Sequence, residues 1–204
     1  MKIAIFGGSF NPIHNGHIKI VLEAIKLLKL DKIIVVPVGI PSHRSDLISG
    51  EHRYEMCKLA FESLDILEGS SITLQEIREK VFISHEEIKS DETSYTYETL
   101  MNFKEIYKNA DFYEIIGEDS GNNFKTWKDY EKILLESKVT VFRRKGNELK
   151  IEKNIRDMML ILDTPYFPYS STEIRKKIEK NINIDGLLPK KVIKYIAYEN
   201  LYKK

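Results

Sequence analysis

Residues 2–38, KIAIFGGSFNPIHNGHIKIVLEAIKLLKLDKIIVVPV, contain the pattern that decides the fold of this chain. The apolar run at 2–6 predicts a buried strand, the helical spacing of apolar residues predicts a helix over 17–30, and the β-branched run predicts a second strand over 32–38. A glycine-rich loop with two histidines separates the first strand from the helix. This order of strand, loop, helix and strand is typical of a parallel sheet with crossover helices.

The rest of the chain continues the alternation of strands and helices. We expect further strands at 71–77, 111–117, 138–144 and 158–163, and helices at 51–64, 95–107, 128–136, from about 171, and near 189–198. Short, wholly apolar strands suit a sheet that is covered on both faces. The sequence therefore predicts an α/β fold: a doubly wound, Rossmann-like parallel sheet with helices on both faces and a small helical part at 165–204. We expect one domain over residues 1–204, with the polar stretch 78–93 as an inserted loop or hairpin.

The composition limits the class of protein. The chain has 204 residues, of which 42% are hydrophobic, so it can bury a substantial core. Its 32 Lys and Arg against 31 Asp and Glu give a net charge of +1, which argues against bulk binding to nucleic acid or an anionic membrane. The single cysteine and the lack of a long apolar run or signal-like N-terminus favour a cytoplasmic protein with no membrane partner.

The loop after the first strand has the composition of a phosphate site. Glycines there let the backbone approach a ligand, and a helix N-terminus offers unpaired N–H groups to an anion. The Rossmann G-x-G-x-x-G and the Walker G-K-[ST] patterns are absent, but Ser9, His14 and His17 supply polar side chains. Imidazole N–H groups can donate to phosphate oxygens in either tautomer. Two alternatives remain: His17 caps the helix while His14 packs in a turn, or the histidines bind a metal, for which no third ligand has a zinc-type spacing.

A second candidate loop, PYSSTEIRKKIEK at 168–180, also follows a strand and opens a helix. Ser170 and Glu173 match a capping box, so these hydroxyls have a purely structural alternative. The same groups can receive phosphate oxygens, and Arg175 lies one turn into the helix with a charged fork for them. The carboxyl ends of parallel strands share one edge of the sheet, where such folds bind ligands. The sequence therefore predicts two phosphate loops at one edge.

These motifs resemble the H-x-G-H nucleotidyltransferase superfamily, and the whole chain is most similar to its bacterial nicotinate-mononucleotide adenylyltransferase family. The likeness rests on GGSFNPIHNGH (7–17), PVGIPSHR (37–44), TSYTYETL (93–100), IIGEDSGNNFKTW (115–127), VFRRKG (141–146), SSTEIR (170–175) and LPKKVIKYI (188–196), in the family's order. The chain departs from the family's pattern in five places: Asn11 stands where the family has aspartate, Ser42 where it has proline, Arg44 where it has lysine and Glu118 where a small residue is common, and the stretch 78–93 is longer than usual. Asparagine keeps the size of aspartate but loses its charge.

The resemblance implies an enzyme that joins ATP and nicotinate mononucleotide to give nicotinate adenine dinucleotide and pyrophosphate, in NAD biosynthesis. It implies in-line attack on the α-phosphate with no covalent intermediate, and Mg²⁺ that arrives with ATP rather than a metal site built by the protein. The catalytic residues would be His14, His17 and Arg175. The ATP-binding residues would be Gly7, Gly8, Ser9, Phe10, Gly16, Gly117, Asp119, Ser170, Ser171 and Thr172. The residues for nicotinate mononucleotide would be Arg44, Tyr95, Thr96, Trp127 and Arg143.

Several alternatives stay open. Phosphopantetheine adenylyltransferases and cytidylyltransferases share the first motif, although the former lack the SYT segment and the tryptophan loop. A non-catalytic nucleotide sensor could keep the same fold. Instead of binding a ligand, Trp127 could be a core residue, and the carboxylate of Asp119 could cap a loop. The preference for the acid over the amide mononucleotide and the oligomeric state, with a homodimer as one option, are not decided by the sequence.

Overall fold

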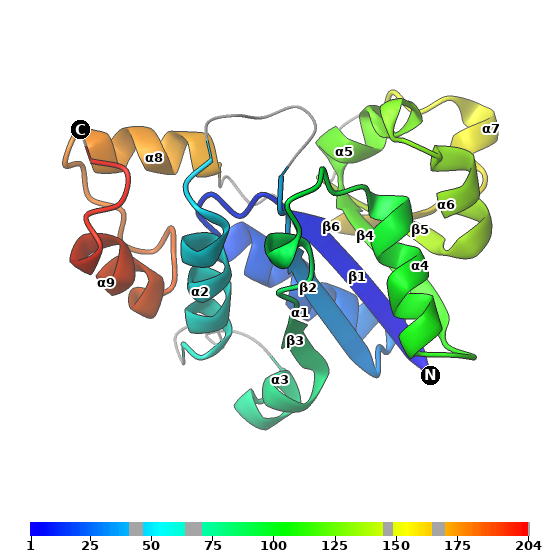
Figure 1. Cartoon of the computed structure of the whole chain (residues 1–204), viewed down its shortest axis with the longest axis horizontal. Helices are drawn as coiled ribbons and strands as arrows, with labels where there is room; N and C mark the ends of the chain where they lie inside the picture. The colour runs from blue at the N-terminus through cyan, green and yellow to red at the C-terminus, as the bar shows by residue number, and fades with distance from the viewer. Residues whose placement is uncertain (41–46, 64–70, 145–148, 165–169, 204) are drawn as a thin grey trace.

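The computed structural model of this chain describes residues 1–40, 47–63, 71–144, 149–164 and 170–203. Within them, parallel strands form one six-stranded sheet in the order β3-β2-β1-β4-β5-β6 (Figure 1). The strands are β1 Lys2–Gly8, β2 Lys32–Pro37, β3 Val81–Ile83, β4 Asp111–Gly117, β5 Lys138–Arg144 and β6 Leu160–Thr164. The order reverses between β1 and β4, and ligands bind at such a switch point.

Helices lie between successive strands, as the alternating pattern predicts, and further helices follow β6. They are α1 Asn15–Leu28, α2 Gly50–Phe61, α3 Leu74–Lys80, α4 Thr96–Ile106, α5 Glu118–Asn122, α6 Tyr130–Glu136, α7 Lys153–Arg156, α8 Ser171–Glu179 and α9 Lys190–Tyr198, with 3₁₀ turns η2 Glu87–Lys89 and η3 Phe124–Thr126. None of the helices in the described ranges is long and apolar enough to cross a bilayer.

Helices cover both faces of the sheet, which confirms the predicted doubly wound class. Ala4 and Phe6 belong to the apolar cluster that α1, α2, α8 and α9 bury on one face. Ile3 and Ile5, which alternate with them along β1, belong to the cluster that α4 and α6 bury on the other. A strand buried on both faces must be apolar throughout, and this explains the run KIAIF.

The prediction of a strand at 71–77 is wrong. Thr73 caps α3, because its hydroxyl oxygen accepts from Glu76 N while the Glu76 carboxylate accepts from Thr73 N. This capping box outweighs the alternating pattern of SITLQEI. The prediction that 78–93 is a loop or hairpin also needs correction, since the stretch contains the end of α3, the strand β3, which pairs in parallel with β2, and the turn η2.

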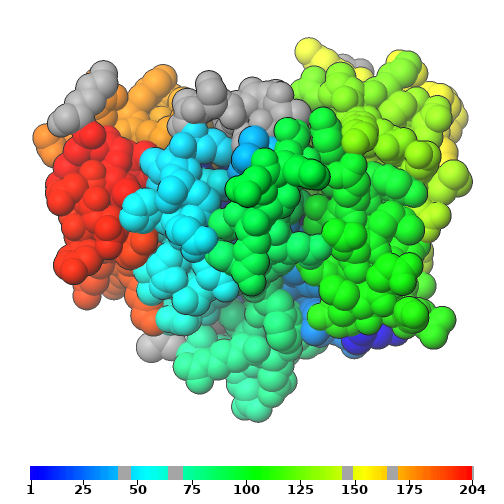
Figure 2. All heavy atoms as spheres, viewed as in Figure 1, coloured from blue at the N-terminus to red at the C-terminus, as the bar shows by residue number. Residues whose placement is uncertain are grey.

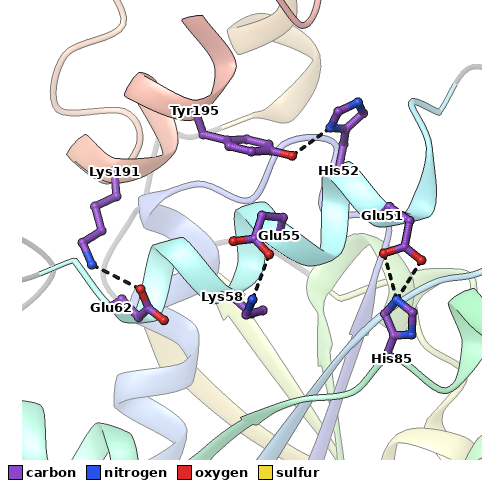
Figure 3. Close-up of polar contacts among 8 residues, drawn as sticks. All are labelled: Glu51, His52, Glu55, Lys58, Glu62, His85, Lys191 and Tyr195. Carbon is purple, nitrogen blue, oxygen red and sulfur yellow. Dashed lines mark hydrogen bonds and ion pairs between the residues drawn. The ribbon is translucent and has the colours of Figure 1, made fainter. Parts of the chain in front are cut away.

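Helix α2 connects the C-terminal helices to the segment after β3. His52 Nδ1 lies 2.8 Å from the Tyr195 hydroxyl of α9, and at the start of α2 the Glu51 carboxylate lies 2.8 Å from His85 Nε2 (Figure 3). In the space-filling view the cyan atoms of α2 lie between the red C-terminal helix and the green atoms that follow β3 (Figure 2). Helix α2 is therefore held at both sides.

Candidate functional site

The candidate site lies at the carboxyl ends of β1 and β4, the two strands of the switch point. A Cβ added at Gly7, near the end of β1, would meet no atom of the described residues within 4 Å, and the same holds for Gly117 at the end of β4. These two of the four predicted ATP-binding glycines therefore border open space above adjacent strands, whereas a Cβ at Gly8 would lie 2.9 Å from the Phe10 ring. Gly16 is buried in the first turn of α1, and Asp119 is exposed in the first turn of α5. The site has room for a ligand that approaches the backbone closely.

Two stacked imidazoles form the start of α1. His14 is the N-cap and His17 the third residue of the helix; each Nδ1 accepts the other residue's backbone N–H, at 3.4 Å and 3.2 Å. The ring centroids are 3.7 Å apart and the planes differ by 15°. An Nδ1 that accepts carries no proton, so the reciprocal cap fixes the proton of each neutral ring on Nε2. Capping uses Nδ1 of both rings and leaves Nε2 for a ligand, so capping and phosphate binding, which the sequence sets against each other, are compatible.

Both imidazoles are neutral at physiological pH in the free protein. Burial lowers the pKa of His14 to about 4. Burial, and then the neighbouring His14, hold the pKa of His17 well below its usual value. The pair therefore contributes Nε2–H donors rather than positive charge until an anion binds.

The ring of Phe10 supports the histidines from inside the protein. Its side chain is 1% exposed and meets the His17 ring edge-on, with centroids 5.1 Å apart. The side chain therefore belongs to the core, and the contact of Phe10 with ATP, which stays a prediction, would use its backbone. The residue has a φ of 43°, a left-handed conformation that non-glycine residues rarely adopt. The chain adopts this conformation within the loop that carries the histidines.

The described part of the second loop contacts the first directly, which goes beyond the shared sheet edge that the sequence predicts. The Ser171 hydroxyl donates to the Pro12 carbonyl at 3.0 Å, and Arg175 Nη1 donates to the Asn11 carbonyl at 2.8 Å. At the start of α8, Ser170 is the N-cap, and its hydroxyl oxygen accepts from Glu173 N at 3.5 Å. Thr172 follows in the first turn and is exposed. The histidines, the hydroxyls and the guanidinium thus belong to one site.

The side chain of Asn11 is hydrogen-bonded to a residue near the C-terminus, Tyr202. Asn11 is 1% exposed, and its Oδ1 accepts from the Tyr202 hydroxyl at 2.9 Å. Burial raises the pKa of Tyr202, so the phenol stays protonated and donates. The sequence gives no sign that Tyr202 reaches this loop. Position 11 therefore supports the loop from within, where a neutral amide avoids the cost of burying a carboxylate.

The residues predicted for nicotinate mononucleotide come from neighbouring segments. Tyr95 is the N-cap of α4 and Thr96 its first residue, with no side-chain cap. Lys128 Nζ lies 3.9 Å from the centre of the Tyr95 ring, which brings the segment of Trp127 to the start of α4. Trp127 is half-buried against Phe124, with ring centroids 5.2 Å apart, so it also contributes to the core.

Of the two arginines predicted for the same substrate, the structure describes Arg143 only. Arg143, on β5, pairs with Asp163 of β6, with Nε and Oδ1 2.5 Å apart. The pKa of Arg143 is raised, mainly by this hydrogen bond to Asp163. Arg44 lies outside the described residues.

Arg53 is a buried residue of this region that the sequence reasoning missed. The residue is 2% exposed, and its guanidinium donates to the carbonyls of Ser9, Ile48 and Gly39, at 3.1, 3.1 and 3.3 Å. A signal was available: positions 53, 56, 57 and 60 have the spacing of one helix face, and the other three residues are apolar. An arginine on an otherwise apolar face indicates a buried cation with backbone partners.

The polar groups of the site are suited to phosphate rather than to a bare metal ion. They are imidazole N–H, hydroxyl, guanidinium and backbone N–H groups, all of which can donate to phosphate oxygens. In the described part of the chain, no three or more His, Cys, Asp or Glu side chains gather where they could hold a metal ion.

The low pKa of His14 makes the stability of the free protein depend on pH. Because the unfolded chain binds a proton below about 6.5 and the folded chain only below about 4, the free energy of unfolding should fall as pH falls through this window, by roughly 3 kcal/mol for this group. In His14→Asn, the asparagine Oδ1 can still cap the helix, but the group that titrates is gone. We therefore expect the free energy of unfolding of this variant to depend less steeply on pH. Urea denaturation between pH 4 and 7 measures it; parallel curves for the two proteins would contradict the assignment.

Comparisons with known proteins agree with this geometry. The family model described as "Cytidylyltransferase-like" matches residues 5–177. A relative from Fusobacterium nucleatum, named "Probable nicotinate-nucleotide adenylyltransferase", is 46% identical over 98% of both chains. A relative of the same name from Clostridium tetani is 37% identical over 99% of both chains.

Solved structures of similar fold carry a similar name. Nicotinic acid mononucleotide adenylyltransferase from Plasmodium falciparum, complexed with NaAD, has a TM-score of 0.79 at 27% identity, over 98% of this chain and 97% of that one. The same enzyme complexed with APC has a TM-score of 0.77 at 26% identity, over 98% and 96%.

Proposed function

The chain belongs to the cytidylyltransferase-like family, among the nicotinate-nucleotide adenylyltransferases, and from this premise we propose that it joins ATP and nicotinate mononucleotide to give nicotinate adenine dinucleotide and pyrophosphate. The observation that carries the proposal is the contact between the two phosphate loops, through Ser171 to Pro12 and Arg175 to Asn11. This contact brings together, at the switch point of the sheet, two sets of groups that can donate hydrogen bonds to phosphate.

The proposed reaction needs no general base. The attacking group is the phosphate of the mononucleotide, which is largely dianionic near neutral pH because its second pKa is about 6. Its oxygen attacks the α-phosphorus of ATP, the bond to the bridging oxygen of pyrophosphate breaks, and pyrophosphate leaves with the electron pair. Catalysis then consists of aligning the two phosphates and stabilising the charge between them. Neutral imidazoles whose protons are fixed on Nε2 suit this task, because they can donate hydrogen bonds to the phosphates and no step requires them to act as bases.

Each loop has its own part in this proposal. His14 and His17 donate to the ATP phosphates, with His17 nearest the α-phosphorus. The N-terminus of α8, with Ser170, Ser171 and Thr172, and the guanidinium of Arg175 hold the β- and γ-phosphates. When bound with ATP, Mg²⁺ would neutralise charge on the phosphate oxygens as pyrophosphate departs.

The mononucleotide would lie between α4 and the loop after α5. Backbone N–H groups at Tyr95 and Thr96 suit the nicotinate carboxylate, since the start of α4 has no side-chain cap. The exposed part of Trp127 would stack on the pyridine ring. Lys128 and its contact with Tyr95 support this placement, because they hold the two segments together. Arg44 and Arg143 remain proposals as phosphate ligands of this substrate.

A substrate panel tests the function. With Mg²⁺-ATP, we expect nicotinate mononucleotide to give pyrophosphate and dinucleotide in equal amounts, with no release from ATP alone. The amide mononucleotide serves as the second acceptor and phosphopantetheine as the third, and pyrophosphate is measured for each. Release with phosphopantetheine only would favour the other adenylyltransferase. Release with none, together with ATP binding, would favour a nucleotide sensor. A cytoplasmic location and a homodimer remain predictions.

A further inference from the structure

Gly39 is held from both sides by charged side chains, the buried Arg53 and the half-buried Glu87. Its N–H donates to Glu87 Oε2 at 3.3 Å, and its carbonyl accepts from Arg53 Nη2 at 3.3 Å. A Cβ at this position would lie 2.0 Å from the Glu87 carbonyl oxygen and 2.9 Å from Ser94 Oγ. The close approach of the segment after β3 therefore requires glycine here.

Glu87 connects Gly39 to the start of α4. Its second oxygen, Oε1, accepts from the Thr99 hydroxyl at 2.6 Å, in the turn that follows Tyr95 and Thr96. The neighbouring backbone makes the same connection, since Ser94 N donates to the Ile40 carbonyl at 3.1 Å. From outside, the Glu51–His85 pair holds this segment against α2 (Figure 3).

Arg53 connects Gly39 to the phosphate loop. The guanidinium that donates to the Gly39 carbonyl also donates through Nη1 to the Ser9 carbonyl at 3.1 Å. A planar fork can hold several carbonyls at fixed spacing, which a lysine ammonium on a flexible stem cannot. One side chain thus fixes the loop after β1 relative to the segment after β2.

Burial lowers the pKa of Arg53, and nearby groups, Glu87 among them, oppose this shift. A buried carboxyl of this region, Glu114, has its pKa raised well above the usual value by burial and then by Glu87. Its Oε2 has no hydrogen-bond partner among the described residues, so a proton on this oxygen would displace no donor. Burial also raises the pKa of Glu87, but the donors Thr99 and Gly39 oppose this shift. Hydrogen bonds thus favour the charged form of Glu87, whereas burial favours the neutral form of Glu114.

We propose that Arg53, Gly39 and Glu87 form a bridge that sets the distance between the ATP loop and the mononucleotide segment, with Arg53 and Glu87 as positioning residues for the reaction. The inference rests on the proposed function, because it assigns ATP to the Ser9 side of the bridge and nicotinate mononucleotide to the α4 side. Arg53 acts on both substrates through Ser9 and Gly39, whereas Glu87 acts on the mononucleotide alone through Gly39 and Thr99.

The two residues predict different kinetic patterns. Glu87→Gln should raise KM for the mononucleotide about 10-fold, the scale of one charged hydrogen bond, with KM for ATP and kcat changed less than about 3-fold. Arg53→Lys should raise KM for both substrates. In the double variant, KM for the mononucleotide should rise about as much as in the worse single variant, because both act through Gly39. Exposed Glu79→Gln and Arg78→Lys, both on α3, are the matched controls.

A second measurement needs no turnover. Hydrogen exchange of the backbone at 37–40 and 94–100 in the free protein should be faster in Glu87→Gln and Arg53→Lys than in the controls, and Mg²⁺-ATP should bind more weakly to Arg53→Lys only. Unchanged exchange, or lower thermal stability with both KM values unchanged, would overturn the bridge. A wild-type protein that does not turn over would contradict the proposed function, while the exchange and ATP-binding results would still decide the inference.

Discussion

The variant His17→Asn is expected to lower kcat by at least about 100-fold, the usual effect of removing one donor to a developing oxyanion, while the fold and its thermal midpoint stay nearly unchanged. The reason lies in the two nitrogens of the ring. Nδ1 accepts from His14 N and completes the cap of α1. An asparagine Oδ1 can take the place of Nδ1, but asparagine has no N–H where Nε2 would meet phosphate.

Two further variants separate this role from a structural one. His17→Gln, whose amide N–H lies near the place of Nε2, should recover part of the turnover even though it weakens the cap. His52→Ala, which removes an imidazole on α2 that contacts Tyr195, should leave kcat unchanged. Dinucleotide formation at saturating substrates gives kcat, and circular dichroism gives the midpoint. A folded His17→Asn protein with near wild-type turnover would show that Nε2 does not act on the phosphates.

The second large effect is expected for Arg175→Met, which should lower kcat/KM for ATP by about 100-fold or more. In the free protein this guanidinium donates to the Asn11 carbonyl, so it lies beside the histidine loop before ATP arrives. Its charge and planar fork suit two phosphate oxygens, and methionine keeps only the apolar stem. KM for nicotinate mononucleotide should change little, because that substrate is assigned to the α4 side.

Lys176→Met is the matched control for Arg175→Met. It removes the same charge one residue further along α8, where Lys176 is exposed and pairs with Glu173. If its kcat/KM for ATP falls as much as that of Arg175→Met, the loss reflects general electrostatics rather than a specific phosphate contact. Arg175→Lys should fall between wild type and methionine, since it keeps the charge and loses the fork.

The fold could be predicted from the sequence wherever a pattern was long and local. The strand at 111–117 and the helices near 95–107 and 189–198 lie within about two residues of β4, α4 and α9. The failure at 71–77 has a physical reason: SITLQEI alternates like a strand, but Thr73 and Glu76 form a capping box that starts a helix. The short edge strand β3 was missed because three residues carry too little periodicity to detect.

The site could be predicted only as far as its local motifs extend. The glycines, the histidines and the hydroxyl loop have the composition of phosphate sites, and the parallel topology puts both loops at one edge. Phe10, Tyr202 and Arg53 depend on contacts between distant segments: a ring turned into the core, a C-terminal hydroxyl on Asn11, and a guanidinium shared by Ser9 and Gly39. Such tertiary contacts leave little trace in local spacing.

The central claim is that the two phosphates react directly while the protein only holds them, and isotope exchange between pyrophosphate and ATP tests it most directly. The enzyme is incubated with Mg²⁺-ATP and labelled pyrophosphate, with and without nicotinate mononucleotide. Direct attack predicts label in ATP only when the mononucleotide or the dinucleotide product is present. Label appearing in ATP without either of them, at a rate comparable with turnover, would indicate an adenylylated enzyme and contradict the account.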